Sequence, residues 1–284
     1  MQSIALNAPA KLNLTLNITG IAPNGYHTLD MVMHTVNLCD TVTLANAADI
    51  SLACPDWLPA TPKNLAWRAA EALREYSNIS RGAAITLTKR IPAEAGMGGG
   101  SADAAAVLVG LNRLWGLGLS DDDLRTVGLK LGSDVPFAIR GGTARVRGVG
   151  DDVQFIDGPR PLWFLLAKPQ GGVSTAECYR LYDALGADSR PDNDAFLQAL
   201  RAGDIPAMAA SSGNALEKAA IALLPEIGAL IERMRGTGSG FVRMTGSGAA
   251  VFAAFETLVQ AEAAQQALGD VFWSAVAQSY TPEF

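Results

Sequence analysis

Residues 91–106 of the chain read Ile91-Pro92-Ala93-Glu94-Ala95-Gly96-Met97-Gly98-Gly99-Gly100-Ser101-Ala102-Asp103-Ala104-Ala105-Ala106. Four of the five positions from 96 to 100 are glycine, which adopts positive φ angles and lets backbone N–H groups approach a ligand closely. Apolar residues then recur at helical spacing, so we expect a helix with Ser101 as its N-cap and Asp103 in its first turn. A glycine loop that leads into a helix N-terminus attracts anions, because unpaired N–H groups and the positive end of the helix dipole point the same way. The stretch therefore predicts a phosphate-binding loop.

Two common phosphate loops do not fit this stretch. The chain contains no Gly-Lys dipeptide, which excludes the Walker A pattern. The dinucleotide fingerprint G-x-G-x-x-G fails as well, since Ser101 stands where its third glycine would be. The alternative without a ligand is a connection between a strand and a helix that is simply rich in glycine, so residues elsewhere must decide.

Composition limits the class of protein. The length of 284 residues suggests about two domains, and 49% apolar with 18% charged residues is ordinary for a globular enzyme. A net charge of −6 argues against a general nucleic-acid surface. The three cysteines, an odd number without a C-x-x-C pair, indicate reduced thiols. With no signal-peptide pattern and no membrane-spanning apolar run, we expect a cytoplasmic protein that contacts neither membrane nor nucleic acid; its oligomeric state stays open.

Strict alternation begins near the N-terminus. The apolar side chains of Leu12, Leu14, Leu16 and Ile18 interleave with the polar ones of Lys11, Asn13, Thr15 and Asn17. This pattern predicts a half-buried strand with a polar face, on which Lys11 lies beside Asn13. That face is either an ordinary solvent-facing edge or the wall of a cleft.

The rest of the chain predicts a mixed structure of two lobes, in the α+β class. A turn-rich segment at 157–161 separates the expected lobes, residues 1–158 and 159–284. We expect helices at 64–76, 120–131, 175–185, 192–200, 205–218, 226–235 and 258–268, and strands at 84–89, 144–149, 162–167 and 271–276, with several short strands between 29 and 54.

Three further places carry candidate functional residues. Tyr26 and His27 follow the turn Pro23-Asn24-Gly25, where the two rings either stack a flat ligand or simply pack. Asp134 is expected at the end of the helix 120–131, where the dipole disfavours a carboxylate, and Pro136 biases Val135 away from helix; an Asx turn is the alternative. Thr245-Gly246-Ser247-Gly248 is a second glycine turn, or else a tight hairpin or bulge.

Three stretches together resemble the GHMP small-molecule kinases: Pro9-Ala10-Lys11-Leu12-Asn13-Leu14, Pro92–Ala104 and Thr245-Gly246-Ser247-Gly248. Within that family, Asn24-Gly25-Tyr26-His27-Thr28-Leu29 and Leu131-Gly132-Ser133-Asp134-Val135-Pro136-Phe137 are similar to a branch that phosphorylates a cytidylyl-diphosphate sugar alcohol for isoprenoid synthesis. The resemblance implies a ribosomal protein S5 domain 2-like N-terminal lobe and a ferredoxin-like C-terminal lobe, with the active site between them. It also implies ATP and Mg²⁺ as cofactors.

The resemblance implies roles for individual residues. Lys11 and Asp134 match the catalytic pair, in which the carboxylate accepts or orients the hydroxyl proton and the ammonium stabilises charge. Residues Pro92–Ala102 match the ATP loop, and Asn64 and Lys89 the nucleotide side. The implied substrate contacts are Asn13, Tyr26, His27, Thr175, Tyr179 and Gly246, of which Tyr26 and His27 hold the cytosine.

Two residues depart from the family loop. Glu94 replaces a glycine, and its carboxylate would repel a triphosphate unless it points outward or meets a cation, whereas Ala102 removes a hydroxyl. The rival interpretations are a homoserine- or mevalonate-type kinase of the same family, a ligand-binding relative without turnover, and a scaffold protein.

Overall fold

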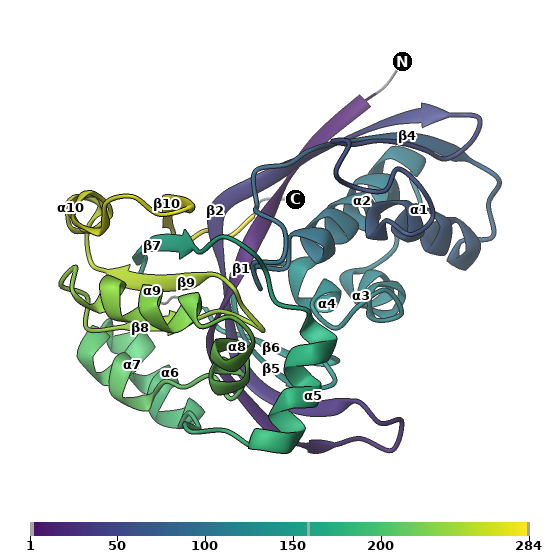
Figure 1. The fold of residues 1–284 in the computed structure, drawn as a ribbon. Coiled ribbons are helices and arrows are strands. Elements are labelled where there is room, and N and C mark those ends of the chain that lie inside the picture. Colours follow the sequence, from purple (N-terminus) through teal and green to yellow (C-terminus); the bar gives the residue numbers. More distant parts are fainter. Residues whose placement is uncertain (1–2, 158–159, 283–284) are drawn as a thin grey trace.

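The computed structural model describes residues 3–157 and 160–282 (Figure 1). The described chain builds two sheets, each accompanied by helices. In the first, β3-β4-β2-β5-β6 follow one another and β1 pairs with β2; in the second the order is β10-β7-β9-β8. The expected two-lobe α+β architecture is confirmed.

The first lobe contains β1 (Ser3–Ile21), β2 (His27–Ala47), β3 (Ser51–Ala53), α1 (Leu65–Tyr76), β4 (Gly82–Thr88), α2 (Gly99–Trp115), α3 (Asp121–Leu129), α4 (Val135–Ala138), β5 (Thr143–Gly148) and β6 (Asp152–Phe155). The second contains β7 (Trp163–Lys168), α5 (Thr175–Leu185), α6 (Asn193–Ala202), α7 (Ile205–Ser211), α8 (Glu217–Leu223), α9 (Glu226–Arg235), β8 (Val242–Met244), β9 (Val251–Phe255), α10 (Leu258–Leu268) and β10 (Trp273–Gln278). The expected boundary between Gly158 and Pro159 lies outside the described residues.

Several expected elements form for local reasons. Helix α1 begins after Asn64, whose side-chain oxygen accepts the N–H of Ala66 at 3.0 Å. Helix α3 begins with a reciprocal capping box between Ser120 and Asp123. The apolar segment at 162–167 forms β7, the centre of the second sheet together with β9.

Other expectations about the elements were wrong. The region 29–54 forms the single long strand β2 and the short β3 rather than several short strands. The helix expected at 205–218 is interrupted at Ser212–Leu216 and forms α7 and α8. The interruption occurs because Gly213 and Ala215 exchange backbone hydrogen bonds with Leu16 of β1, which a continuous helix could not offer.

Strand β1 is not half-buried as expected but buried along its centre. Leu12 and Leu14 pack into a core that also contains Phe164 and Phe252 of the second sheet. On the opposite face, Lys11 retains only 7% and Asn13 only 2% of their exposure. The two long strands β1 and β2 run between the lobes (Figure 1), so the second lobe covers surface that the alternation alone leaves open to solvent.

Candidate active site

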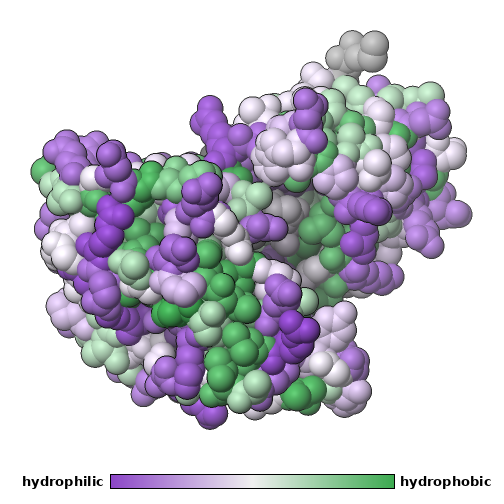
Figure 2. Space-filling view, viewed as in Figure 1, coloured by the Kyte–Doolittle hydropathy of each residue, from purple (hydrophilic) through white to green (hydrophobic). Residues whose placement is uncertain are grey.

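A cleft of about 480 Å³ lies between the lobes. The space-filling view shows the surface hollowed between the part that carries α1–α4 and the part that carries α6–α10 (Figure 2). Of the residues to which the resemblance gives a catalytic, nucleotide or substrate role, all line the cleft except Ser101, Ala102, Tyr26 and His27. The structure thus brings together side chains from β1, the glycine loop, the segment before α4, and the second lobe.

The glycine loop enters α2 differently from expectation. Gly96 and Gly98 have φ angles of +69° and +68°, and Gly98 itself occupies the N-cap position of α2. Ser101 therefore lies inside the helix rather than at its N-cap, and Asp103 lies beyond the first turn. The left-handed conformation of Gly98 starts the helix before the serine is reached. As a result, the N–H groups at the start of a 17-residue helix face the cleft.

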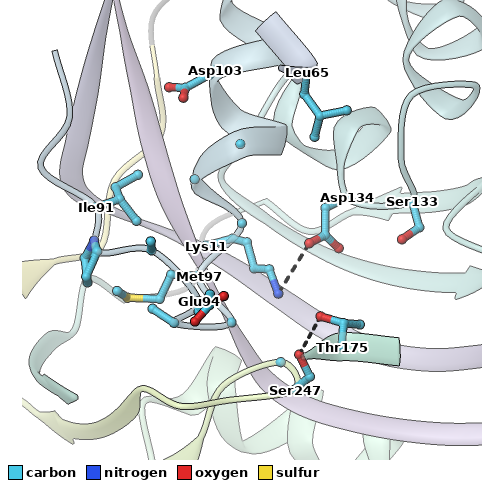
Figure 3. Close-up of a pocket in the computed structure, with 18 of the residues that line it drawn as sticks. Lys11, Leu65, Ile91, Glu94, Met97, Asp103, Ser133, Asp134, Thr175 and Ser247 are labelled. Atoms are coloured by element: carbon cyan, nitrogen blue, oxygen red, sulfur yellow. Dashed lines mark hydrogen bonds and ion pairs between the residues drawn. The ribbon is translucent and has the colours of Figure 1, made fainter. Parts of the chain in front are cut away.

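Lys11 and Asp134 face each other across the cleft (Figure 3), with 3.5 Å between Lys11 Nζ and Asp134 Oδ2. Lys11 also donates to Asn13 Oδ1 at 2.5 Å. A Cβ added to Gly98 would lie 3.0 Å from Lys11 Cγ and 3.5 Å from Asp134 Oδ2. The glycine loop thus passes directly against this pair, and a side chain at position 98 would be crowded by Lys11 and strained by the φ angle of +68°.

Asp134 stands before α4 rather than at the end of a helix as expected. It occupies the N-cap position of α4 but makes no side-chain capping bond. The expectation that Pro136 keeps Val135 out of a helix was wrong, because proline is tolerated in the first helical turn. The carboxylate, 26% exposed, is free to accept a proton or a hydrogen bond from a ligand.

The second glycine turn packs directly on the first. It joins β8 to β9, and the N–H groups of Ala249 and Ala250 donate to the carbonyls of Glu94 and Ala95 at 3.1 Å each. Beside it, the hydroxyls of Thr175 and Ser247 lie 2.9 Å apart at the cleft wall (Figure 3). The loop from the first lobe is therefore held by main-chain bonds from the second.

Glu94, the unusual residue of the loop, has a φ angle of +50° and lies with its carboxylate against Gly172 of the second lobe. Burial lowers the pKa of Lys168, and the negative charge of Glu94 acts in the opposite direction. The Lys168 ammonium is thus close enough to act on the Glu94 carboxylate, while Glu94 also lines the cleft.

Lys89 takes part in a buried ionic cluster next to the loop. Its ammonium pairs with Asp40 and, at 2.5 Å, with Asp103. The other oxygen of Asp40 accepts the backbone N–H groups of Arg90 and Ile91, at 2.5 and 2.9 Å. Burial raises the pKa of Asp103 to about 7, against the opposing effect of Lys89. Neither carboxylate was nominated, because nothing near Asp40 or Asp103 in sequence indicates Lys89 as a partner.

His27 lies outside the lining of the cleft but next to Tyr179, which is part of it. The two ring centroids are 4.8 Å apart, and His27 Nε2 lies 2.7 Å from Asp183 Oδ1 on α5. Tyr26 is 70% exposed. The second lobe therefore fixes the orientation of His27, through a carboxylate that sequence reasoning missed.

Sequence reasoning also missed one wall of the cleft. This wall is formed by the segment that precedes α1 in the sequence, with Trp57, Leu58, Pro59 and Lys63 before Asn64 and Leu65. The available signal was a tryptophan in a segment without periodicity, and Trp57 is indeed 56% exposed. This wall offers an apolar surface on the loop side of the cleft.

The described residues hold neither a metal-ligand cluster nor a helix that could span a membrane. Residues 3–157 and 160–282 contain no group of three His, Cys, Asp or Glu side chains placed to hold a metal ion. Within the same ranges, no helix has the length and apolar character needed to cross a membrane.

Comparison with known proteins gives consistent matches. The GHMP kinases N terminal domain matches residues 64–142, and the GHMP kinases C terminal domain matches residues 196–272. Proteins named 4-diphosphocytidyl-2-C-methyl-D-erythritol kinase are similar in sequence: that of Brevibacillus brevis is 42% identical, covering 92% of this chain and 89% of the relative, and that of Alkaliphilus metalliredigens is 40% identical, covering 99% and 98%. A crystal structure of 4-(cytidine 5'-diphospho)-2C-methyl-D-erythritol kinase superposes with a TM-score of 0.81 at 32% identity, covering 99% of this chain and 100% of the other.

Proposed function

The chain belongs to the GHMP kinase family, and we propose that it transfers the γ-phosphoryl group of ATP to the 2-hydroxyl of 4-diphosphocytidyl-2-C-methyl-D-erythritol. Relatives with that name match nearly the whole chain. The observation that carries the proposal is the Lys11–Asp134 pair against a glycine loop at the start of a long helix. The chain is a kinase of this family.

ATP binds with its phosphates on the glycine loop. The N–H groups of residues 96–101 and the start of α2 supply hydrogen bonds and a favourable dipole for the triphosphate. The base lies toward Asn64 and Trp57, on the apolar wall of the cleft. The triphosphate lies away from the Glu94 carboxylate, which packs against Gly172 of the second lobe.

Asp134 receives the proton of the acceptor hydroxyl or orients that hydroxyl in line with the γ-phosphorus. A bond forms between the hydroxyl oxygen and phosphorus as the bond from phosphorus to the β–γ bridging oxygen breaks, and ADP leaves. Lys11 stabilises the charge that develops on the transferred group, which is where phosphoryl transfer gains most from a protein. Asn13 holds the Lys11 ammonium in place.

The cytidylyl-diphosphate group binds on the side of the second lobe. His27, oriented by Asp183 and packed against the tilted ring of Tyr179, recognises the cytosine together with Tyr26. Thr175 and Gly246 offer polar contacts to the remainder of the substrate. Homoserine and mevalonate, the rival acceptors, have no base for this aromatic group to bind.

Mg²⁺ accompanies ATP in the proposed reaction and neutralises phosphate charge. The described residues offer no carboxylate cluster to hold it, which suits an ion that keeps its waters and takes phosphate oxygens as ligands. We place the enzyme in the cytoplasm, where ATP is available and its free cysteines stay reduced.

The proposal is tested by ADP release from ATP and Mg²⁺ with 4-diphosphocytidyl-2-C-methyl-D-erythritol, run beside homoserine and mevalonate. We expect turnover only with the cytidylyl compound. Turnover with another alcohol would keep the roles of Lys11 and Asp134 but remove the cytosine site. If the protein binds ATP but phosphorylates none of these alcohols, it is a ligand-binding relative of the kinases and not an enzyme of this kind.

A further inference from the structure

The outer edge of β1 holds both glycine turns through two adjacent main-chain donors. The N–H of Lys11 donates to the carbonyl of Met97 in the first turn, at 3.0 Å. Two residues further, the N–H of Asn13 donates to the hydroxyl oxygen of Thr245 in the second turn, at 2.9 Å. Alternate residues of a strand direct their N–H groups to the same edge, so both contacts lie side by side.

Thr245 connects three segments that are distant in sequence. It is completely buried, and its hydroxyl, besides accepting from Asn13, lies 3.5 Å from the carbonyl oxygen of Gly96. Its own main chain is fixed, since its N–H donates to Ala250 and its carbonyl accepts from Gly248, both at 3.0 Å. A Cβ on Gly96 would collide with the Thr245 carbonyl, and a Cβ on Gly246 would lie 2.7 Å from that of Gly96. The two turns are interlocked, with Thr245 at the junction.

We propose that Thr245 is a positioning residue for phosphoryl transfer, which sets the place of the phosphate loop relative to the strand that carries Lys11. This inference rests on the proposed function. The hydroxyl joins the β1 backbone to the loop within two residues of Lys11 and within two of Gly98, which touches the Lys11–Asp134 pair. Thr245 does not line the cleft, so it acts through the loop and not on a substrate.

Substitutions that remove or keep the Thr245 hydroxyl distinguish its positioning role from simple packing. Valine has nearly the shape of threonine but cannot accept the N–H of Asn13, which then stays buried without a partner. The loop keeps its main-chain bonds from Lys11, Ala249 and Ala250 but loses the link to β1 through the Thr245 hydroxyl. We expect the loop to shift as a result, and displacement of a reacting group by about 1 Å can cost about 100-fold in rate. Serine keeps the hydroxyl and should keep the junction.

The experiment compares Thr245→Val, Thr245→Ser and Thr15→Val. Thr15 is a matched control on the same strand: it is also fully buried, accepts the N–H of Val32 at 2.9 Å and donates to Asn193 at 2.6 Å, but lies outside the cleft lining. We expect Thr245→Val to lower kcat about 10- to 100-fold with the KM of the acceptor changed less than about threefold, Thr245→Ser to restore kcat, and Thr15→Val to lower the melting temperature without changing kcat.

Amide hydrogen exchange without substrates gives a second measurement. Exchange at residues 96–100 should rise in Thr245→Val and stay at the wild-type level in Thr245→Ser and Thr15→Val. Equal kcat in wild type and folded Thr245→Val, or loss of activity in proportion to melting temperature in both valine variants, would overturn the proposal. If Thr245→Val does not fold, Thr245→Ala replaces it. If wild type phosphorylates no alcohol, the proposed function fails, whereas the exchange at 96–100 still tests the role of Thr245.

Discussion

Lys11 Nζ lies 3.5 Å from Asp134 Oδ2, although the two residues are 123 positions apart in the chain. Lys11 is fixed by β1 and by Asn13, whereas Asp134 stands before the short helix α4. The glycine loop passes beside both. The pair therefore joins a buried cation and an accessible carboxylate beside the loop on which we propose that the triphosphate binds.

Replacement of Asp134 tests the carboxylate. We expect Asp134→Asn to lower kcat by at least about 100-fold, because the amide cannot accept the hydroxyl proton. Steady-state kinetics of ADP release measures the effect. Asp122→Asn, which removes an exposed carboxylate paired with Arg125, serves as the control and should leave kcat unchanged. Wild-type turnover in Asp134→Asn would contradict the assignment.

Replacement of Lys11 separates charge stabilisation from binding. Lys11→Met keeps the length of the side chain and removes its charge, so we expect a loss of kcat of about 100-fold or more while ATP still binds the loop. Steady-state turnover measures the loss of kcat, and calorimetric titration with ATP measures the retained binding. If kcat is unchanged, Lys11 has no role in the transfer step.

His27 tests the recognition of the cytidylyl group. We expect His27→Ala to raise the KM for 4-diphosphocytidyl-2-C-methyl-D-erythritol about tenfold, the scale of one lost hydrogen bond and an aromatic contact. The KM for ATP should stay the same, because His27 lies on the side of α5 and not on the glycine loop. An unchanged KM for the cytidylyl compound would remove His27 from the substrate site.

Asp103 should make the protein less stable as pH rises. Burial raises its pKa in the folded protein to about 7 from 3.8, so the folded state binds more protons than the unfolded state between these values, and the free energy of unfolding falls across that window. Asp103→Asn should weaken this fall and retain the pair between Lys89 and Asp40. Urea unfolding of both proteins at pH 5 and pH 8 measures it; an equal fall in both would contradict the role of Asp103.

His34 should make the protein less stable as pH falls, the opposite of the effect of Asp103. It lies between the hydroxyls of Thr143 and Ser279, at 2.8 Å each, and burial lowers its pKa to about 4 from 6.5. The unfolded state therefore binds the extra proton first, and stability falls as pH drops below 6.5, by up to about 1.4 kcal/mol per pH unit. We expect His34→Gln to flatten the dependence between pH 7.5 and pH 5 in urea unfolding. The same slope in the variant would assign the acid sensitivity to other groups.

Short-range patterns in the sequence predicted much of the fold. The alternation at Leu12 and Leu14, the capping box of Ser120 and Asp123, and the run of glycines before α2 each depend on residues that are near neighbours in the chain. They were enough to place most elements and to predict the phosphate loop, whereas the catalytic roles of Lys11 and Asp134 were implied by the resemblance to the GHMP kinases. The errors, at Ser101, Val135 and residues 205–218, arose where backbone geometry or a partner from the other lobe decided the local structure.

The sequence by itself determined which residues could carry the chemistry, because residue type and local spacing follow directly from the chain. Only the tertiary structure decided what these residues touch. The ammonium of Lys89 is taken by Asp40 and Asp103, His27 is held by Asp183, and Thr245 accepts the N–H of Asn13 across 232 positions. Such pairings have no local periodicity, since they join residues far apart in the chain: Lys89 is paired within the first lobe, whereas His27 and Asn13 are paired across the two lobes. A polar group that the fold buries must find a partner wherever the fold places one.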